Sequence, residues 1–134
     1  MKIDIDKIVD ALEMVSETMQ AYYNTDTGEI EWLGEFLFGD EYEEASDRIE
    51  FGNYISLPTK YDIHEYRIME DFVYSLPAGE AQNMLNRAFK GKGAFRRFKD
   101  AVIYLGVDKE WYSFRDETYR NIALKWCRQY GLKE

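Results

Sequence analysis

The sequence predicts an α+β protein. The expected order is an N-terminal helix, a small antiparallel sheet made of a hairpin plus a third strand, and a C-terminal group of about four helices. Three observations predict this class. Apolar residues recur at helical spacing at the start of the chain, alternate with acidic residues over residues 29–33, and return to helical spacing from about residue 62 onward.

The first helix is predicted over residues 5–19. Asp4 or Asp6 can serve as its N-cap, because a carboxylate there accepts hydrogen bonds from the free backbone N–H groups of the first turn. The apolar positions at helical spacing are Ile5, Ile8, Val9, Leu12, Val15 and Met19. The period changes at about residue 20, so a strand is expected to follow.

A β-hairpin is predicted next, with residues 21–23 and 29–33 on either side of a turn at 25–28. Ile30 and Trp32 alternate with Glu29 and Glu31, a pattern that buries one face of a strand and leaves the other in water. Gly28 supplies the left-handed backbone conformation that such a turn usually needs.

An acidic segment separates the hairpin from the third strand. Residues 40–45 predict a short exposed helix within the acidic stretch 35–50. Apolar side chains then lie at alternate or near-alternate positions at Ile49, Phe51, Ile55 and Leu57. Part of residues 48–57 is therefore predicted to be the third strand, which Pro58 ends because proline cannot donate to a ladder.

Four helices are predicted from residue 62 onward. Asp62 and Glu65 have capping-box spacing at the start of the first, and Pro77 precedes the second, which glycines at 91–93 end. The third ends near residue 106, and the last spans about 108–130. Their apolar stripes are Met69, Phe72, Val73 and Leu76; Ala81, Met84, Leu85, Ala88 and Phe89; Phe95, Phe98, Ala101, Val102 and Leu105; and Trp111, Phe114, Tyr119, Ile122, Ala123, Trp126 and Tyr130.

Length and composition predict a single globular domain over residues 1–134, since 46% hydrophobic and 16% aromatic residues exceed what disordered chains contain. Cys127 is the only cysteine, which argues against a secreted disulfide scaffold. The start of the chain is acidic where a signal peptide would be apolar. No stretch reaches the ~20 apolar residues that span a bilayer. We therefore expect a cytoplasmic protein that does not enter membranes.

The strongest functional indication is an uneven distribution of charge. Residues 1–86 carry twenty acidic and five basic side chains, a net charge of −15, whereas residues 87–134 carry twelve basic and six acidic ones, a net charge of +6. Such asymmetry indicates a charged partner. The total of −9 argues against indiscriminate coating of nucleic acid but leaves a local basic site open.

The basic residues are densest beside the glycines at 91 and 93, just before a predicted helix. A helix N-terminus offers free N–H groups and a positive dipole end, and glycine lets an anion approach closely. The candidate binding residues are Lys92, Arg96, Arg97, Lys99 and Arg115. The spacing matches neither a phosphate-binding P-loop nor a dinucleotide fingerprint. The alternative is a helix–helix turn whose cations face solvent or pair with the protein's own acids, with Arg115 in a local or interhelical ion pair.

No catalytic residue, metal site or cofactor is predicted. His64 is the only histidine, so no triad can be argued from spacing. Cys127 is expected to be a small buried apolar residue, and one cysteine with one histidine cannot complete a zinc site. Residues 24–35 faintly resemble a calcium loop, but the glycine is one place early and a hairpin turn accounts for the residues better. The acids of 40–47 are expected to form a solvated face.

Three motifs resemble a small bacterial family. They are Gly-Lys-Gly-Ala-Phe-Arg-Arg-Phe-Lys-Asp at 91–100, Trp-Tyr-x-Phe-Arg-Asp at 111–116, and Tyr-Arg-Ile-Met-Glu-Asp-Phe at 66–72. With the Asp-Thr-Gly-Glu turn at 26–29, they make the chain similar to uncharacterised protein family 0158 over residues 8–130. The resemblance implies a single-domain bacterial protein, cytoplasmic or phage-borne. It implies no activity, so no catalytic role is carried over.

Three functional hypotheses remain at this point. The first is a non-enzymatic interaction domain with acidic and basic faces, whose partner is another protein or a second copy of the chain. The second is a binder of nucleic acid or a phosphate ligand through the same basic residues, which requires steep salt dependence. The third is an enzyme with an unrecognised carboxylate site, which requires a pocket with converging acids.

Overall fold

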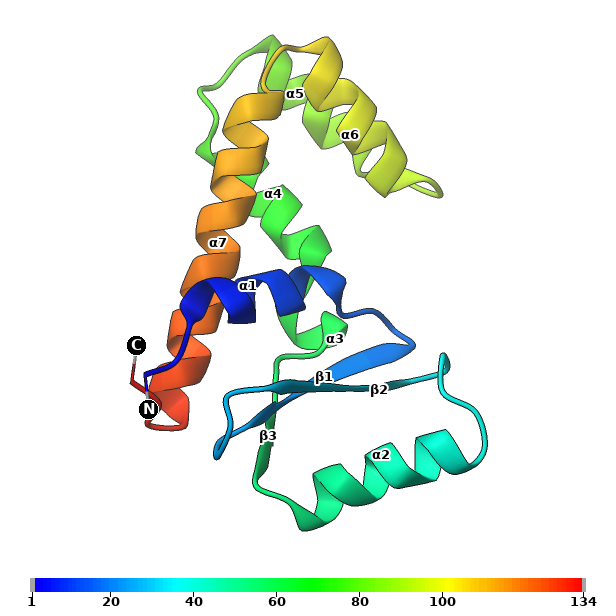
Figure 1. The fold of residues 1–134 in the computed structure, drawn as a ribbon. Helices are drawn as coiled ribbons and strands as arrows, with labels where there is room; N and C mark the ends of the chain where they lie inside the picture. The colour runs from blue at the N-terminus through cyan, green and yellow to red at the C-terminus, as the bar shows by residue number, and fades with distance from the viewer. Residues whose placement is uncertain (1, 134) are drawn as a thin grey trace. The chain divides into compact units, whose positions relative to one another are not determined.

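The computed structural model describes residues 2–133 and divides the chain into two compact units (Figure 1). The first, here called the sheet unit, comprises the described residues 2–63 and 119–133, and the second, the helical unit, comprises residues 64–118. The predicted α+β class and order of elements are confirmed. Over the described residues, no helix is long and apolar enough to cross a membrane.

The sheet unit is built on three antiparallel strands in the order β2-β1-β3. Strands β1 (Met19–Asn24) and β2 (Ile30–Gly34) form the predicted hairpin, and β3 (Tyr54–Ser56) pairs with the other edge of β1. Because side chains alternate along a strand, Ala21 and Tyr23 of β1 share one face and Tyr22 lies on the other. The register pairs Tyr22 with Glu31 on one side and Ser56 on the other.

Helices cover both faces of this sheet. Helix α1 (Ile5–Met14) and α2 (Asp40–Phe51) lie on opposite sides of it (Figure 1). Ala21 and Tyr23 are buried on one face, where the Tyr23 ring meets Trp126 edge-on at 5.8 Å between centroids. Trp126 belongs to α7 (Asp108–Gln129), whose second part lies in the sheet unit. Its indole N–H donates to the carbonyl oxygen of Ser56 at 2.9 Å, so the ring ties α7 to β3.

The first helix is shorter than predicted. It ends at Met14, and Val15 already has extended backbone angles. Ser16 and Met19 form an isolated antiparallel bridge, and the Ser16 hydroxyl accepts a hydrogen bond from the backbone N–H of Thr18. The tight turn at 16–19 thus ends the helix, because hydroxyl side chains offer the backbone an alternative to helical bonding.

The boundary between α2 and β3 also differs from the prediction. Helix α2 continues to Phe51, six residues beyond the expected end, and the third strand occupies only residues 54–56. Ala45 is buried and Ile49, four residues later, is partly buried, which is the spacing of one helix face. The third strand predicted within residues 48–57 is therefore confirmed at residues 54–56, whereas Ile49 and Phe51 belong to α2.

The helical unit contains α4 (Glu65–Ser75), α5 (Glu80–Ala88), α6 (Ala94–Tyr104) and the first part of α7. Its core is aromatic. Phe98 is fully buried, with ring centroids 4.9 Å from Trp111, 5.3 Å from Phe89 and 6.3 Å from Phe72. These rings come from α4, α6, α7 and the residue that follows α5, so this cluster holds the unit together.

The start of α4 differs from the predicted capping box at Asp62 and Glu65. Asp62 instead pairs reciprocally with Thr59: its carboxylate accepts from the Thr59 backbone N–H at 3.0 Å, and its own N–H donates to the Thr59 hydroxyl at 3.1 Å. That box begins the short helix α3 (Lys60–Ile63). Helix α4 follows His64, which has left-handed backbone angles of φ 55° and ψ 66° and no capping hydrogen bond from its side chain.

Substitution of His64 is expected to report on this backbone conformation. Histidine in the left-handed region is strained by about 1 kcal/mol, and a β-branched residue is strained more. His64→Gly should leave the free energy of unfolding unchanged or raise it by up to about 1 kcal/mol, whereas His64→Val should lower it by about 1–2 kcal/mol. Urea unfolding measures both, and equal values for the two variants would contradict the prediction.

A basic surface on α5 and α6 as the candidate functional site

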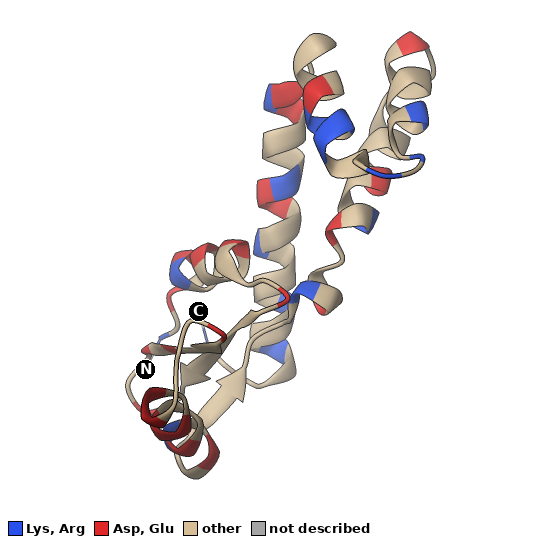
Figure 2. Cartoon of the chain, turned by 90° about the vertical axis from the view of Figure 1, so that its right-hand side faces the viewer, with Lys and Arg blue, Asp and Glu red and all other residues tan. Residues whose placement is uncertain are grey.

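The loop between α5 and α6 carries the predicted basic motif. Gly91 and Gly93 both have positive φ, 78° and 76°, so this turn uses the left-handed conformation that glycine adopts without strain. Figure 2 shows lysine and arginine colouring this loop and the beginning of α6. The hypothesis that these glycines end one helix and precede the next is confirmed.

Arg97 forms hydrogen bonds to the backbone of the loop. Its guanidinium group donates to the backbone carbonyl oxygens of Lys90 and Lys92, and to that of Gly91 at 3.3 Å. These carbonyls lie in the loop after the end of α5 and have no partner in a helix or strand, and a cationic side chain is a favourable donor to them. Arg97 therefore stabilises the loop, a role that its neighbour Arg96 does not share.

Lys92, Arg96 and Lys99 are exposed. Within residues 64–118, all of which the structure describes, none of the three has a side-chain hydrogen bond or ion pair. They lie close to the N-terminus of α6, where Gly93 supplies no capping side chain and the first turn holds no acid. The positive end of the helix dipole thus adds to three cations that the helical unit does not neutralise.

Arg115 has a defined partner. Its Nε donates to Glu65 Oε1 at 2.8 Å, which joins α7 to the first turn of α4. Both side chains are partly buried, at 25% and 19% exposure. Arg115 therefore forms an interhelical ion pair, which was the alternative to a binding role. Its partner is Glu65 and not a neighbour in sequence.

A groove runs between α5 and α6 beside the basic loop. Its volume is about 440 Å³, and the lining residues are Met84, Arg87, Ala88, Arg97, Asp100, Ala101 and Tyr104. The floor is mainly apolar and the rim is charged. The lining has one carboxylate, that of Asp100, whereas an acid–base pair would need two.

Arg87 is the groove residue that sequence reasoning missed. It was counted among the basic residues but lies before the glycines, outside the dense motif. The only sign in the sequence of its place is its spacing from the apolar residues of the helix. Residues 84, 87 and 88 lie at i, i+3 and i+4, which places them on one helix face.

The different roles of Arg96 and Arg97 give a matched pair of variants. Arg97→Ala leaves three loop carbonyls without their donor and should lower the free energy of unfolding by about 1–2 kcal/mol. Arg96→Ala removes an exposed side chain without a partner in the unit and should change it by less than about 0.5 kcal/mol. Urea unfolding of both variants measures the difference, and equal losses would show that Arg97 is not the residue that holds the loop.

The sheet unit carries the opposite charge. Helix α2 has six acidic residues and one basic residue over Asp40–Phe51, a net charge of −5. Arg48, its one cation, donates to Glu31 of β2 at 2.5 Å, and this hydrogen bond raises the pKa of the guanidinium above its ordinary value. Figure 2 shows the ribbon of this helix coloured mostly red, the colour of aspartate and glutamate. The solvated acidic face predicted for residues 40–47 is therefore confirmed.

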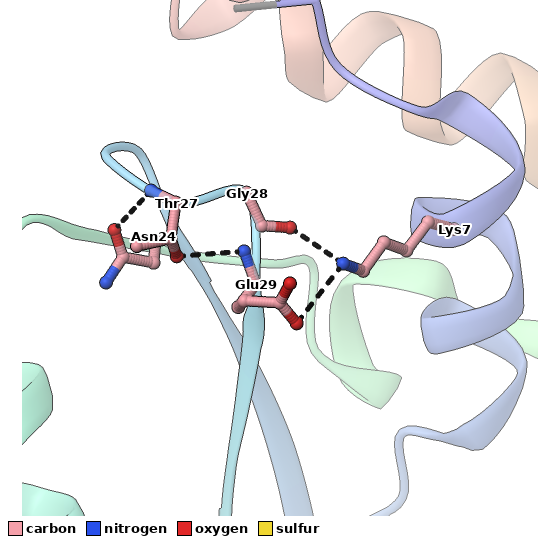
Figure 3. Close-up of polar contacts among 5 residues, drawn as sticks. All are labelled: Lys7, Asn24, Thr27, Gly28 and Glu29. Carbon is pink, nitrogen blue, oxygen red and sulfur yellow. Dashed lines mark hydrogen bonds and ion pairs between the residues drawn. The ribbon is translucent and has the colours of Figure 1, made fainter.

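The hairpin turn accounts for the residues that resembled a calcium loop (Figure 3). Asn24 Oδ1 accepts from the backbone N–H of Thr27 at 3.1 Å, and the Thr27 hydroxyl accepts from that of Glu29 at 3.1 Å. The Lys7 ammonium group donates to the carbonyl of Gly28 at 2.9 Å and lies 3.5 Å from Glu29 Oε2. These oxygens therefore fix the turn and bind a cation that belongs to the protein. Across residues 2–133 no three His, Cys, Asp or Glu side chains gather as a metal site.

The sequence also singled out Cys127 and His64. Cys127 is buried, as expected for a small apolar side chain. His64 is exposed at the start of α4.

Comparison with known proteins extends the likeness seen in the motifs. The model of the uncharacterised protein family UPF0158 matches residues 1–133. The chain belongs to this family. No curated protein and no solved structure matches it. Membership in UPF0158 brings no function with it, because the family is uncharacterised. The surfaces of the protein are therefore the guide to its function.

Proposed function

We propose that this UPF0158 protein is a non-enzymatic protein-interaction domain that binds an acidic partner through Lys92, Arg96 and Lys99. The observation that carries the proposal is that these three exposed cations have no acidic partner within the helical unit, beside the uncapped start of α6. Exposed charge of one sign orients and speeds association with a surface of the other sign. Arg97 stabilises the loop that carries Lys92. Arg115 joins α7 to α4 within the same unit.

Carboxylates suit this surface better than a nucleic-acid backbone does. Asp100 interrupts the cations on the groove side, and the chain as a whole has a net charge of −9, which repels a long polyanion. A short acidic segment of a protein would meet the cations alone. We place this binding in the bacterial cytoplasm, in keeping with the presence of only one cysteine in the sequence.

Fluorescence anisotropy tests the proposal with defined probes. Labelled polyglutamate of ~20 residues and labelled single-stranded and duplex oligonucleotides of matched charge are titrated at ~50 and ~200 mM salt. We expect the polyglutamate to bind at least tenfold more tightly than either oligonucleotide. Arg96→Glu with Lys99→Glu should remove that binding.

The matched control is Lys125→Glu with Arg128→Glu, which changes the net charge equally on exposed positions of α7 in the sheet unit. It should bind polyglutamate nearly as the unaltered chain does. Tighter binding of an oligonucleotide, lost in the first double variant and steeply dependent on salt, would make the protein a nucleic-acid binder. Equal losses in both double variants would show that net charge alone governs binding.

A further inference from the structure

We infer that the groove between α5 and α6 takes helix α2 of a second copy of this chain, so that the protein associates head to tail. This inference deepens the proposed function and rests on it, because it names the acidic partner. It depends on three observations about α2 and the groove: an aromatic anchor, opposite charge, and matching spacing along the two helices.

The outward face of α2 combines acids with one large apolar side chain. Asp40, Glu44, Asp47 and Phe51 lie at i, i+4, i+7 and i+11, which places them on one stripe of the helix. The buried Ala45 lies on the side that packs against the sheet. Phe51 is 81% exposed at the C-terminal end of the stripe, where it has the form of an anchor that a pocket could bury.

The groove is complementary to this stripe, because it has apolar surface and lies among basic side chains. Met84, Ala88, Ala101 and Tyr104 provide apolar surface for a ring. Residues 80–104 hold six basic and two acidic side chains, a net charge of +4 against −5 for α2. Arg87, which lines the groove, and Arg96, which precedes the lining residue Arg97 in sequence, can each meet a carboxylate of the incoming helix. Complementary charge of this kind sets orientation as well as encounter rate.

The spacing of the two helices matches. Along α2, Glu44 precedes Phe51 by seven residues, and along α6, Arg97 precedes Tyr104 by seven residues. At 1.5 Å of rise per residue, both intervals are about 10 Å. An α2 helix lying parallel to α6 therefore brings its acids to the Arg87 and Arg97 end of the groove when Phe51 reaches the Met84 and Tyr104 end.

A contact between two different surfaces is heterologous. In a pair joined by one such contact, one copy keeps an unused groove and the other an unused α2, so association continues into rings or open chains rather than stopping at a symmetric dimer. The surface available to one helix in one groove is small, and interfaces below about 1,200 Å² are usually weak and transient. We expect association in the range of tens to hundreds of micromolar.

Sedimentation velocity of the whole chain tests the inference at ~10 to ~500 μM protein and low salt. The average mass should rise with concentration. Phe51→Ser should weaken association about 30-fold or more, as loss of an aromatic anchor does. Arg87→Glu with Arg96→Glu should have the same effect from the groove side. Tyr61→Ser removes another exposed aromatic side chain of the sheet unit and should associate like the unaltered chain.

Mixing the two defective chains gives the decisive result. The Phe51→Ser chain retains its groove and the Arg87→Glu, Arg96→Glu chain retains its α2, so the mixture can form one intact contact per pair. It should form 1:1 complexes that grow no further, while each chain alone stays monomeric. An interface outside these surfaces would let each variant associate on its own, and a mixture that forms no 1:1 complexes would show that α2 does not enter the groove. Either result would make the inference wrong.

Substitution of Asp100 is expected to strengthen association, whereas the substitutions above weaken it. It is the one carboxylate that lines the groove and it faces the acids of an incoming α2, so Asp100→Asn should tighten association several-fold. Unchanged or weaker association of that variant would count against the groove. A chain that stays monomeric at ~500 μM but still binds polyglutamate would overturn the second copy as partner and leave the proposed function standing.

Discussion

Replacement of Phe98 by alanine is expected to cost the helical unit about 3–5 kcal/mol of unfolding free energy. Phe98 is fully buried, and its ring meets Trp111 of α7, Phe72 of α4 and Phe89 at the end of α5. No neighbour can fill the space left by the ring without moving a whole helix. The loss is therefore both the apolar area of the side chain and a cavity in the centre of the cluster.

Urea unfolding followed by hydrogen exchange locates this loss in the chain. Phe95→Ala is the matched control, because Phe95 lies one helical turn earlier on α6, is 48% exposed and touches Tyr66. That variant should lose less than about 1.5 kcal/mol. If the two variants were equally destabilised, burial in the aromatic cluster would not be the cause.

Replacement of Trp126 by alanine should cost the sheet unit a similar 3–5 kcal/mol or so. Trp126 is 4% exposed, packs edge-on against Tyr23 and donates its indole N–H to the Ser56 carbonyl. Trp126→Phe keeps an aromatic ring but leaves that carbonyl without its donor. This variant should lose about 1–2 kcal/mol, so urea unfolding of the two variants separates packing from hydrogen bonding.

The two variants together test the prediction of one domain over residues 1–134. A single cooperative domain unfolds in one transition, so Phe98→Ala and Trp126→Ala would lower the same midpoint and expose amides throughout the chain. We expect this result. Two transitions, with each variant lowering only the transition of its own unit, would show that residues 64–118 form a domain inserted into the other.

Elements with a strong local period could be predicted from sequence, and boundaries decided by distant contacts could not. The stripes of the C-terminal helices were sufficient because each buries a face at helical spacing. The extent of α2 depended on Ala45 packing against the sheet, which alternation at Ile49 and Phe51 concealed. The end of α1 depended on a side-chain hydrogen bond at Ser16 that no periodicity records.

The candidate site, too, could be predicted from the sequence only in part. The loop glycines and the cations around them follow from sequence, because composition and spacing place them before a helix. The sequence assigns Arg96 and Arg97 the same role, and only the geometry shows that Arg97 donates to the loop carbonyls. Arg115 and Glu65 are fifty residues apart, so their pairing depends on how the helices of the unit pack.

The order of the strands limits how this protein can join other chains. Both outer strands of a three-stranded sheet leave backbone donors and acceptors open to another strand. Here β3 has only three residues and Pro58 follows it closely, while β2 carries Glu31 among its five residues. Short length, proline and charge are the features by which natural sheets resist growth at their edges. Assemblies that form through α2 and the groove should therefore show no gain in β-structure.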